Sequence, residues 1–202
     1  MRAYKIVSFS VVILLITVVF AGAVPAAAQY DTMQYRYNAA HTGDYSPVAG
    51  SVPSNGQLLW NYTITGYEGY VDSSPAVANG VVYVGSYDNN LYALNATTGT
   101  MLWSFTTGGG VYSSPAVANG VVYVGSWDFN GDVYALNATT GAEVWDYMTG
   151  SNEGGSPAVA NGMVYVGQGS NLYALNATTG AKVWNYGTQA PTSSPAVANG
   201  VV

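Results

Sequence analysis

The residues best suited to metal chemistry form one short segment, Asp128-Phe129-Asn130-Gly131-Asp132. Its carboxylate and amide oxygens stand at positions 1, 3 and 5, as in the first half of a calcium-binding loop. The segment lacks the glycine at position 6, which is Val133, and the glutamate at position 12, which is Thr139. We therefore interpret it as a turn between two strands and predict no metal ligands.

The sequence offers few residues that could serve in nucleophilic or acid–base catalysis. His41 is the only histidine, and no serine or aspartate partner for it can be placed from the sequence. The absence of cysteine excludes disulfides, iron–sulfur clusters and thiolate zinc sites. No glycine-rich phosphate loop leads from a strand into a helix. We predict no catalytic residue and no cofactor-binding residue.

Carboxylates interspersed with aromatic residues form the remaining candidate site. Aromatic rings stack on sugars and carboxylates accept hydroxyl hydrogen bonds, and the same combination suits cationic ligands. The alternative is that the carboxylates are ordinary polar loop residues and the aromatic rings cover the ends of the structural units. The candidate binding residues are Tyr67, Glu68, Tyr70, Asp72, Tyr87, Asp88, Tyr112, Trp127, Asp128, Phe129, Asp132 and Glu153.

Charge and composition narrow the class of protein. The 202 residues include only 4 Lys or Arg against 10 Asp or Glu, which gives a net charge of -6. A nucleic-acid partner is excluded because so few cations cannot neutralise a row of phosphates. With 49% apolar residues the chain can fill a sizeable core, and its 25 Gly and 18 Tyr favour short strands and turns.

The first 28 residues read as a secretory signal peptide. Arg2 and Lys5 precede an apolar stretch, and an Ala-x-Ala pattern ends at Ala28, where we expect cleavage. An uncleaved membrane anchor is the alternative, because no charge occurs from Ile6 to Ala28. Either reading predicts an exported protein that is extracellular, on the cell surface or periplasmic, with residues 29–57 as a lead-in segment.

Internal repeats determine the expected fold of residues 58–202. Ser-Pro-Ala-Val-Ala-Asn-Gly recurs with its proline at Pro75, Pro115, Pro157 and Pro195. Leu-Asn-Ala-Thr-Thr-Gly recurs with its glycine at Gly99, Gly141 and Gly180, and Trp103, Trp145 and Trp184 follow four residues later. Trp60 belongs to an orphan copy of the last part. Each unit of about 40 residues reads as four strands joined by tight turns, the first of them an Asn-Gly hairpin.

These observations predict an all-β protein, a β-propeller of four-stranded antiparallel blades. The full blades are expected at 74–107, 114–149 and 156–188, with partial blades on either side. Residues 195–202 reproduce only the start of a blade, so we expect an incomplete propeller, truncated at its C-terminus, with an open edge that promotes association.

The lengths of the loops differ between the two faces expected for such a propeller. The distance from proline to the turn glycine is always 5 residues, and from the third strand to tryptophan always 12. The turn between strands 2 and 3 and the link to the next blade vary in length, and both lie on the same face. Variable loops on a rigid scaffold commonly carry binding residues, and the candidate residues above fall on these loops.

The repeated Leu-Tyr-Ala-Leu-Asn-Ala-Thr-Thr-Gly-x-x-x-Trp closely resembles the tryptophan-docking motif of quinoprotein-type (PQQ-like) propeller repeats. A WD-type repeat fits less well, because aspartate follows the periodic tryptophan only at Trp145. Residues 35–43 also resemble the segment before the first blade of exported PQQ-like proteins. The resemblance implies that Trp103, Trp145 and Trp184 are buried between blades beside Gly99, Gly141 and Gly180, with Trp60 less well covered.

Four Asn-x-Thr sequons, at Asn61, Asn95, Asn137 and Asn176, are glycosylation acceptors if the host has the machinery. Asn95, Asn137 and Asn176 stand where the family more often has aspartate. The alternative for these three is that each side chain caps its turn by accepting backbone N–H hydrogen bonds.

Two functions follow from the resemblance. The first is an exported, non-catalytic scaffold that binds a protein or carbohydrate ligand, similar to the outer-membrane assembly lipoproteins, with a membrane contact only through an uncleaved N-terminal anchor. The alternative is a fragment of a quinoprotein dehydrogenase that uses PQQ and calcium. The near-identical units lack the irregular insertions that such an active site requires, which favours the scaffold and predicts no enzymatic activity.

Overall fold

A computed structural model describes residues 59–64, 70–151, 154–188 and 193–202. These ranges contain strands and turns, and none of their residues forms a helix able to cross a membrane. The expected signal peptide (1–28), the lead-in segment (29–57) and His41 lie outside the described residues.

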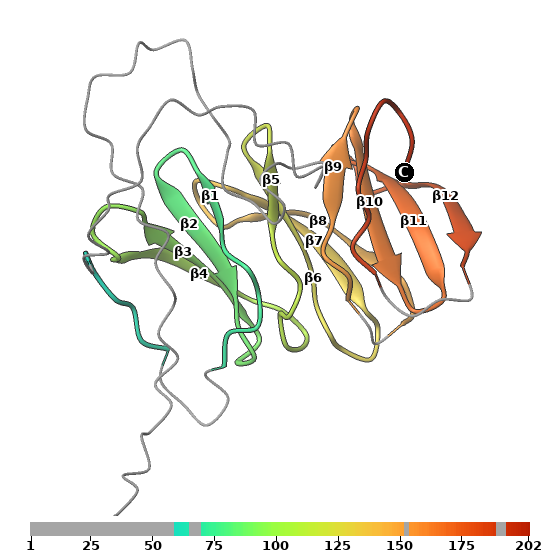
Figure 1. The fold of residues 1–202 in the computed structure, drawn as a ribbon. Helices are drawn as coiled ribbons and strands as arrows, with labels where there is room; N and C mark the ends of the chain where they lie inside the picture. The colour runs from blue at the N-terminus through green and yellow to red at the C-terminus, as the bar shows by residue number, and fades with distance from the viewer. Residues whose placement is uncertain (1–58, 65–69, 152–153, 189–192) are drawn as a thin grey trace, which may run out of the picture.

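The strands form three antiparallel four-stranded sheets, each with its strands in chain order, which confirms the predicted β-propeller blades (Figure 1). Blade 1 contains β1 (Ala76–Ala78), β2 (Val81–Gly85), β3 (Asn90–Asn95) and β4 (Met101–Thr106). Blade 2 contains β5 (Ala116–Ala118), β6 (Val121–Gly125), β7 (Asp132–Asn137) and β8 (Glu143–Met148). Blade 3 contains β9 (Ala158–Ala160), β10 (Met163–Gln168), β11 (Asn171–Asn176) and β12 (Lys182–Gly187).

An Asn-Gly turn joins the first two strands of every blade. In blade 1, Asn79 and Gly80 have φ values of 51° and 77°, the left-handed pair that a two-residue hairpin of type I′ requires. The turn recurs at Asn199-Gly200, where Ala198 and Val201 form an antiparallel bridge. The described start of the fourth unit therefore repeats the local structure of the three full blades.

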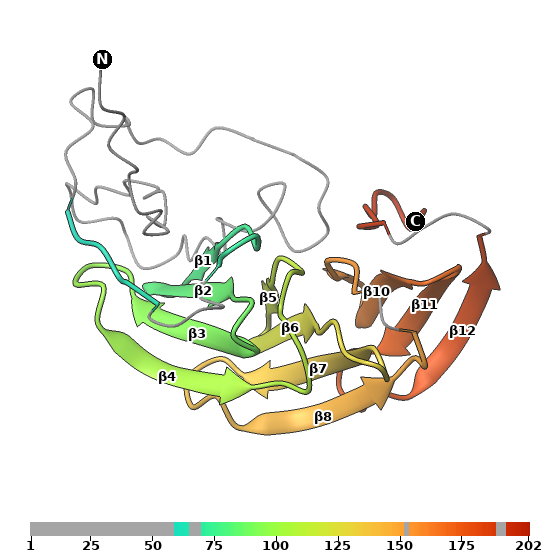
Figure 2. The same ribbon diagram turned by 90° about the horizontal axis from the view of Figure 1, so that it is seen from below.

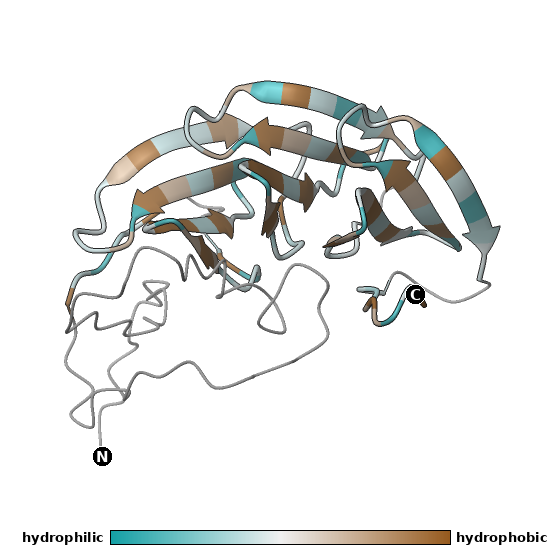
Figure 3. Ribbon diagram, turned by 90° about the horizontal axis from the view of Figure 1, so that it is seen from above, coloured by the Kyte–Doolittle hydropathy of each residue, from teal (hydrophilic) through white to brown (hydrophobic). Residues whose placement is uncertain are grey.

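The blades fan out side by side, with β4, β8 and β12 along the outer rim (Figure 2). The second strands are almost fully buried, whereas β12 is exposed along its whole length. The hydropathy colouring follows this division, since hydrophilic residues interrupt the outer strands (Figure 3). The second strand of blade 2 is covered on both faces because blades 1 and 3 pack against it. In blade 1, Trp60, Tyr62 and Val71 cover the face that points away from blade 2.

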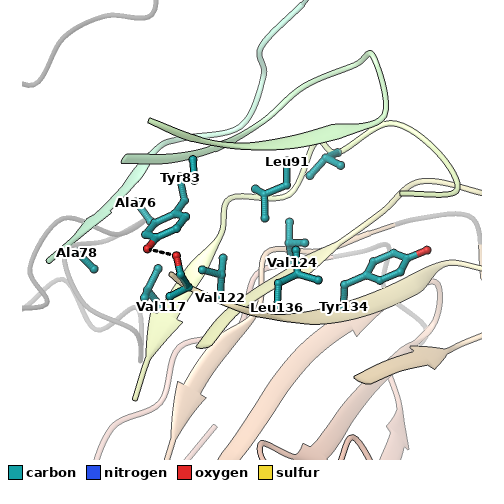
Figure 4. Packing of buried hydrophobic residues seen from close by; sticks show 12 residues of the cluster. Ala76, Ala78, Tyr83, Leu91, Val117, Val122, Val124, Tyr134 and Leu136 are labelled. Atoms are coloured by element: carbon teal, nitrogen blue, oxygen red, sulfur yellow. Dashed lines mark hydrogen bonds between the residues drawn. The ribbon is translucent and has the colours of Figure 1, made fainter. Parts of the chain in front are cut away.

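The core lies between the blades. One cluster joins Tyr83 and Leu91 of blade 1 to Val117, Val124 and Leu136 of blade 2 (Figure 4). A second cluster repeats this arrangement between blades 2 and 3. Because each blade is too thin to bury its own apolar faces, the stability of a blade depends on its neighbours.

Serines at the inner edge link one blade to the next. The backbone N–H of Ser74 donates to Ser114 Oγ (3.0 Å), and that of Ser114 donates to Ser156 Oγ (2.8 Å). The N–H of Ser156 donates in turn to Ser194 Oγ at 3.3 Å. The same contact therefore connects four successive units in a head-to-tail direction, and it seats the start of the fourth unit against blade 3.

Candidate functional site

Each docked tryptophan contacts the turn of the following blade. Its indole N–H donates to a backbone carbonyl: Trp60 to Ala96 (2.9 Å), Trp103 to Ala138 (3.1 Å) and Trp145 to Ala177 (3.0 Å). The acceptor alanine comes from the Asn-Ala-Thr-Thr-Gly turn that joins the third and fourth strands. The repeated motif therefore joins neighbouring units. The alanine of each turn accepts the indole N–H of the preceding unit, and the tryptophan of the same motif docks on the turn of the following unit.

Two features of the structure require glycine at the last position of this turn. Gly99, Gly141 and Gly180 have φ values of 71°, 72° and 71°, a region that side chains disfavour. A Cβ at Gly99 would lie 2.5 Å from the Trp60 indole, and one at Gly141 would lie 2.7 Å from the Trp103 indole. The indole of the preceding blade therefore packs directly on the backbone of the turn.

The expected burial of Trp184 is wrong. This side chain is 39% exposed, whereas Trp145 is 8% exposed. Among the described residues no alanine carbonyl accepts its indole N–H, and the ring contacts Tyr165 at 5.9 Å between centroids. Trp60, expected to be less well covered, is half-buried like Trp103, because it docks on blade 1.

Three of the sequon asparagines cap turns. Asn137 Oδ1 accepts the backbone N–H groups of Thr139 and Thr140, both at 2.9 Å. Asn95 and Asn176 make the same pair of hydrogen bonds in blades 1 and 3. Asn61 is exposed on the segment before blade 1.

The turns of constant length meet on one face of the array. In each blade the N–H of the turn alanine donates to the carbonyl of the Asn-Gly glycine, as from Ala138 to Gly120 at 2.9 Å. The opposite face carries the turns between the second and third strands together with the links between blades. We call this second face the variable face.

Four of the candidate aromatic residues form a continuous row on the variable face. The ring of Tyr70 lies 6.0 Å from that of Tyr87, which lies 4.1 Å from Tyr112. Tyr112 in turn lies 4.7 Å from Trp127. Successive rings cross at 77°, 72° and 68°, the edge-to-face geometry that aromatic pairs favour. We call these four residues the aromatic row.

Backbone hydrogen bonds hold the row in place. The N–H of Tyr87 donates to the carbonyl of Tyr70 (2.9 Å), and the N–H of Trp127 donates to that of Gly110 (2.8 Å). Ser86 links the Tyr70 segment to the segment that carries Tyr112, because its hydroxyl donates to the Tyr70 carbonyl and its own carbonyl accepts the N–H of Val111. The ring positions are therefore set by the scaffold.

Two carboxylates beside the row are fixed by local donors. Asp88 accepts the N–H of Asn90 (3.2 Å) and the hydroxyl of Tyr92 (2.6 Å). Burial and Asp88 together raise the pKa of the Tyr92 hydroxyl far above its usual value, so this hydroxyl stays a donor. Asp128 accepts the N–H groups of Asn130 and Gly131 and the hydroxyl of Ser126.

Asp132 is a buried member of the candidate set. It is 8% exposed, and its Oδ2 accepts the hydroxyl of Tyr134 at 3.1 Å. Its Oδ1 accepts no hydrogen bond from any described residue. Desolvation, and then the nearby Asp128 carboxylate, raise the pKa of Asp132 above its usual value. The Asp128–Asp132 segment is a turn that leads into β7, as interpreted from the sequence.

The other candidates are scattered. Phe129 is 95% exposed at the tip of its turn, and Asp72 is exposed beside the start of blade 1. Tyr67, Glu68 and Glu153 lie outside the described residues. Within the described part of the chain no group of three or more His, Asp or Glu side chains is arranged to hold a metal ion.

Some contacts were not foreseen from the sequence. The hydroxyls of Tyr83 and Tyr123 donate to the same alanine carbonyls that accept the docked indoles, both at 3.0 Å. Buried Gln168 has an Oε1 that accepts no hydrogen bond from the described residues. The tyrosine that recurs in each second strand was the visible signal for the hydroxyl contacts, and the serine that recurs before each proline was the signal for the serine hydrogen bonds between blades.

Comparison with known proteins gives a family match and several structural neighbours. The family model described as outer membrane protein assembly factor BamB matches residues 47–199. BamB of Salmonella typhimurium is 35% identical over 69 residues, which cover 30% of this chain and 18% of the relative. BamB of Escherichia coli K12 is 33% identical over the same length and coverage. The matched region is thus a small part of these curated relatives.

Solved structures agree on the fold. The crystal structure of BamB from Moraxella catarrhalis aligns with a TM-score of 0.56 at 24% identity, covering 65% of this chain and 40% of that one. A quinohemoprotein alcohol dehydrogenase, ADHIIG from Pseudomonas putida HK5, aligns with a TM-score of 0.55 at 27% identity, covering 61% and 21%. With the docking contacts repeated in successive blades and the family model matching residues 47–199, the chain belongs to the PQQ-like β-propeller family of the outer membrane protein assembly factor BamB.

Proposed function

We propose that the chain is a non-catalytic scaffold that binds a protein partner through its variable face. The carrying observation is the contrast between its two faces. The turns of one face repeat the same hydrogen bonds in every blade, whereas the other holds a row of contacting aromatic rings. The relatives' name, assembly factor, supports a role in holding other proteins.

Export is part of this proposal. The positive start, apolar middle and Ala-x-Ala pattern of residues 1–28 direct the chain out of the cytoplasm. The periplasm or the cell surface is then its place of action. N-terminal sequencing of the secreted protein tests the cleavage: a mature chain that begins at Gln29 supports a cleaved signal, and an intact residue 1 supports an anchor.

Site-specific photo-crosslinking tests the binding face. A benzoylphenylalanine at position 129, where Phe129 is 95% exposed, reports on the variable face. The matched control is position 139, where Thr139 is exposed on the opposite face of the same blade. We expect discrete cross-linked protein bands from position 129 and none from position 139. Equal labelling from both positions contradicts the assignment of the face.

The similarity to a quinohemoprotein alcohol dehydrogenase supports a second candidate, a PQQ- and calcium-dependent dehydrogenase. The described residues do not fit a calcium ion that would hold PQQ, because no third acidic or histidine side chain among them joins Asp128 and Asp132. Alcohol-dependent dye reduction after addition of PQQ and calcium would establish the dehydrogenase, and its absence is expected.

A further inference from the structure

The aromatic row is not required by the fold. Blade 3 has Gly169 where blades 1 and 2 have Tyr87 and Trp127, and Gly154 where blade 2 has Tyr112. Blade 3 nevertheless forms the same four strands in the same order. Packing of a blade therefore does not explain why four rings gather on blades 1 and 2.

The shape of the row suits an extended ligand. Its ring contacts link Tyr70, Tyr87, Tyr112 and Trp127 in succession, and the two end residues are 55% and 47% exposed. Rings that bind a cation surround it as a cage with several faces aimed at one point. In the row, two further rings separate the exposed rings of Tyr70 and Trp127, so these two residues offer distinct apolar surfaces that an extended chain of sugar rings can contact at once.

The charges beside the row disfavour an anionic ligand, and the carboxylates suit a ligand rich in hydroxyl groups. Lys182 is the only Lys or Arg within the described ranges, and it lies on the outer strand β12. Phosphate, sulfate or uronic acid groups would find no cation among the described residues there and would meet Asp88 and Asp128. Those two carboxylates are already oriented by two or more internal donors, and their remaining lone pairs can accept ligand hydroxyls.

We propose that the aromatic row, with Asp88 and Asp128 beside it, binds a neutral oligosaccharide chain. Sugar rings stack on the exposed surfaces of Tyr70 and Trp127, and hydroxyl groups donate to the flanking carboxylates. This inference rests on the proposed role of the variable face as a binding surface, and it adds the chemical class of a ligand.

Isothermal titration calorimetry of the full chain tests the proposal with defined probes. The probes are cellohexaose, maltohexaose and chitohexaose, with hexalysine as the cationic alternative. Trp127→Ala and Tyr70→Ala remove the ends of the row, and Tyr186→Ala is the matched control, an aromatic side chain that is 69% exposed on the outer strand β12. Circular dichroism confirms that each variant is folded.

We expect at least one hexasaccharide to bind, with affinity reduced about tenfold by either row substitution, which corresponds to about 1.4 kcal/mol, and within about twofold of wild type in the control. Absence of binding by all three hexasaccharides overturns the proposal, as does binding that both row variants retain. Binding of hexalysine alone overturns it in favour of a cationic partner. If saccharide binding fails while cross-linking at position 129 persists, the carbohydrate inference fails and the protein scaffold stands.

Discussion

Replacing Gly141 by alanine tests the contact between blades most directly. Gly141 has a φ of 72°, and a Cβ there would lie 2.7 Å from two carbons of the Trp103 indole. Gly120 of the same blade has nearly the same φ, 76°, but a Cβ there meets nothing within 4 Å. The two glycines therefore share the backbone cost and differ in the indole contact.

The expected magnitudes follow from this difference. Placing alanine in the left-handed region costs roughly 1–2 kcal/mol, which is the whole effect expected for Gly120→Ala. Gly141→Ala adds the cost of forcing a methyl group into a packed contact, typically about 1–3 kcal/mol. The Trp103 indole is held by its hydrogen bond to Ala138 at 3.1 Å, so it cannot move away without losing that bond. We expect Gly141→Ala to destabilise the protein by about 2–5 kcal/mol in total.

Urea denaturation followed by circular dichroism measures both variants, and the Trp103→Ala background completes a double-mutant cycle. In the Trp103→Ala background, Gly141→Ala should lower the free energy of unfolding no more than Gly120→Ala does, because only the cost of a left-handed backbone for alanine remains. If Gly141→Ala is no more destabilising than Gly120→Ala in the wild-type background, Trp103 does not pack on this turn and the docking geometry is wrong.

Three further predictions concern single side chains. Trp145→Ala should cost about 3–5 kcal/mol in urea denaturation because Trp145 is buried and hydrogen-bonded, whereas Trp184→Ala should cost less than half as much; similar losses would contradict the difference in burial. Asn137→Asp should change stability by less than about 0.5 kcal/mol, since the carboxylate accepts the same two N–H groups, and Asn137→Ala should cost about 1 kcal/mol. Because the pKa of Asp132 is raised, the folded state binds its proton more tightly than the unfolded chain, and stability falls as pH rises above about 3.9. Asp132→Asn should therefore raise the free energy of unfolding at pH 7 more than at pH 3, and equal changes at the two pH values would refute this.

The repeats made the blades predictable. The Asn-Gly dipeptides located the hairpins, and the fixed spacing from the third strand to tryptophan located β3 and β4 almost to the residue. The docking partner was harder to predict, because the sequence places Gly141 and Trp145 in one motif whereas the structure pairs Gly141 with Trp103. Periodicity alone cannot tell a contact within a unit from one between neighbouring units.

The candidate site was predictable only as a set of residues on one face. Sequence spacing placed Tyr70, Tyr87, Tyr112 and Trp127 on the variable loops, but no pattern in the sequence states that their rings touch. The loops come from different blades, and their approach depends on how blades 1 and 2 pack. Asp132 is buried whereas Asp128 is half-buried, although the two are only four residues apart in the chain. The sequence does not predict this difference in burial.

The direction of the docking contacts has a consequence for the order of folding. Trp60, Trp103 and Trp145 find their acceptors 36, 35 and 32 residues further along the chain. A growing polypeptide therefore completes the packing of each blade only after the next one has been synthesised. Every such step is short in sequence, which favours sequential folding from the first blade onward over a single late collapse.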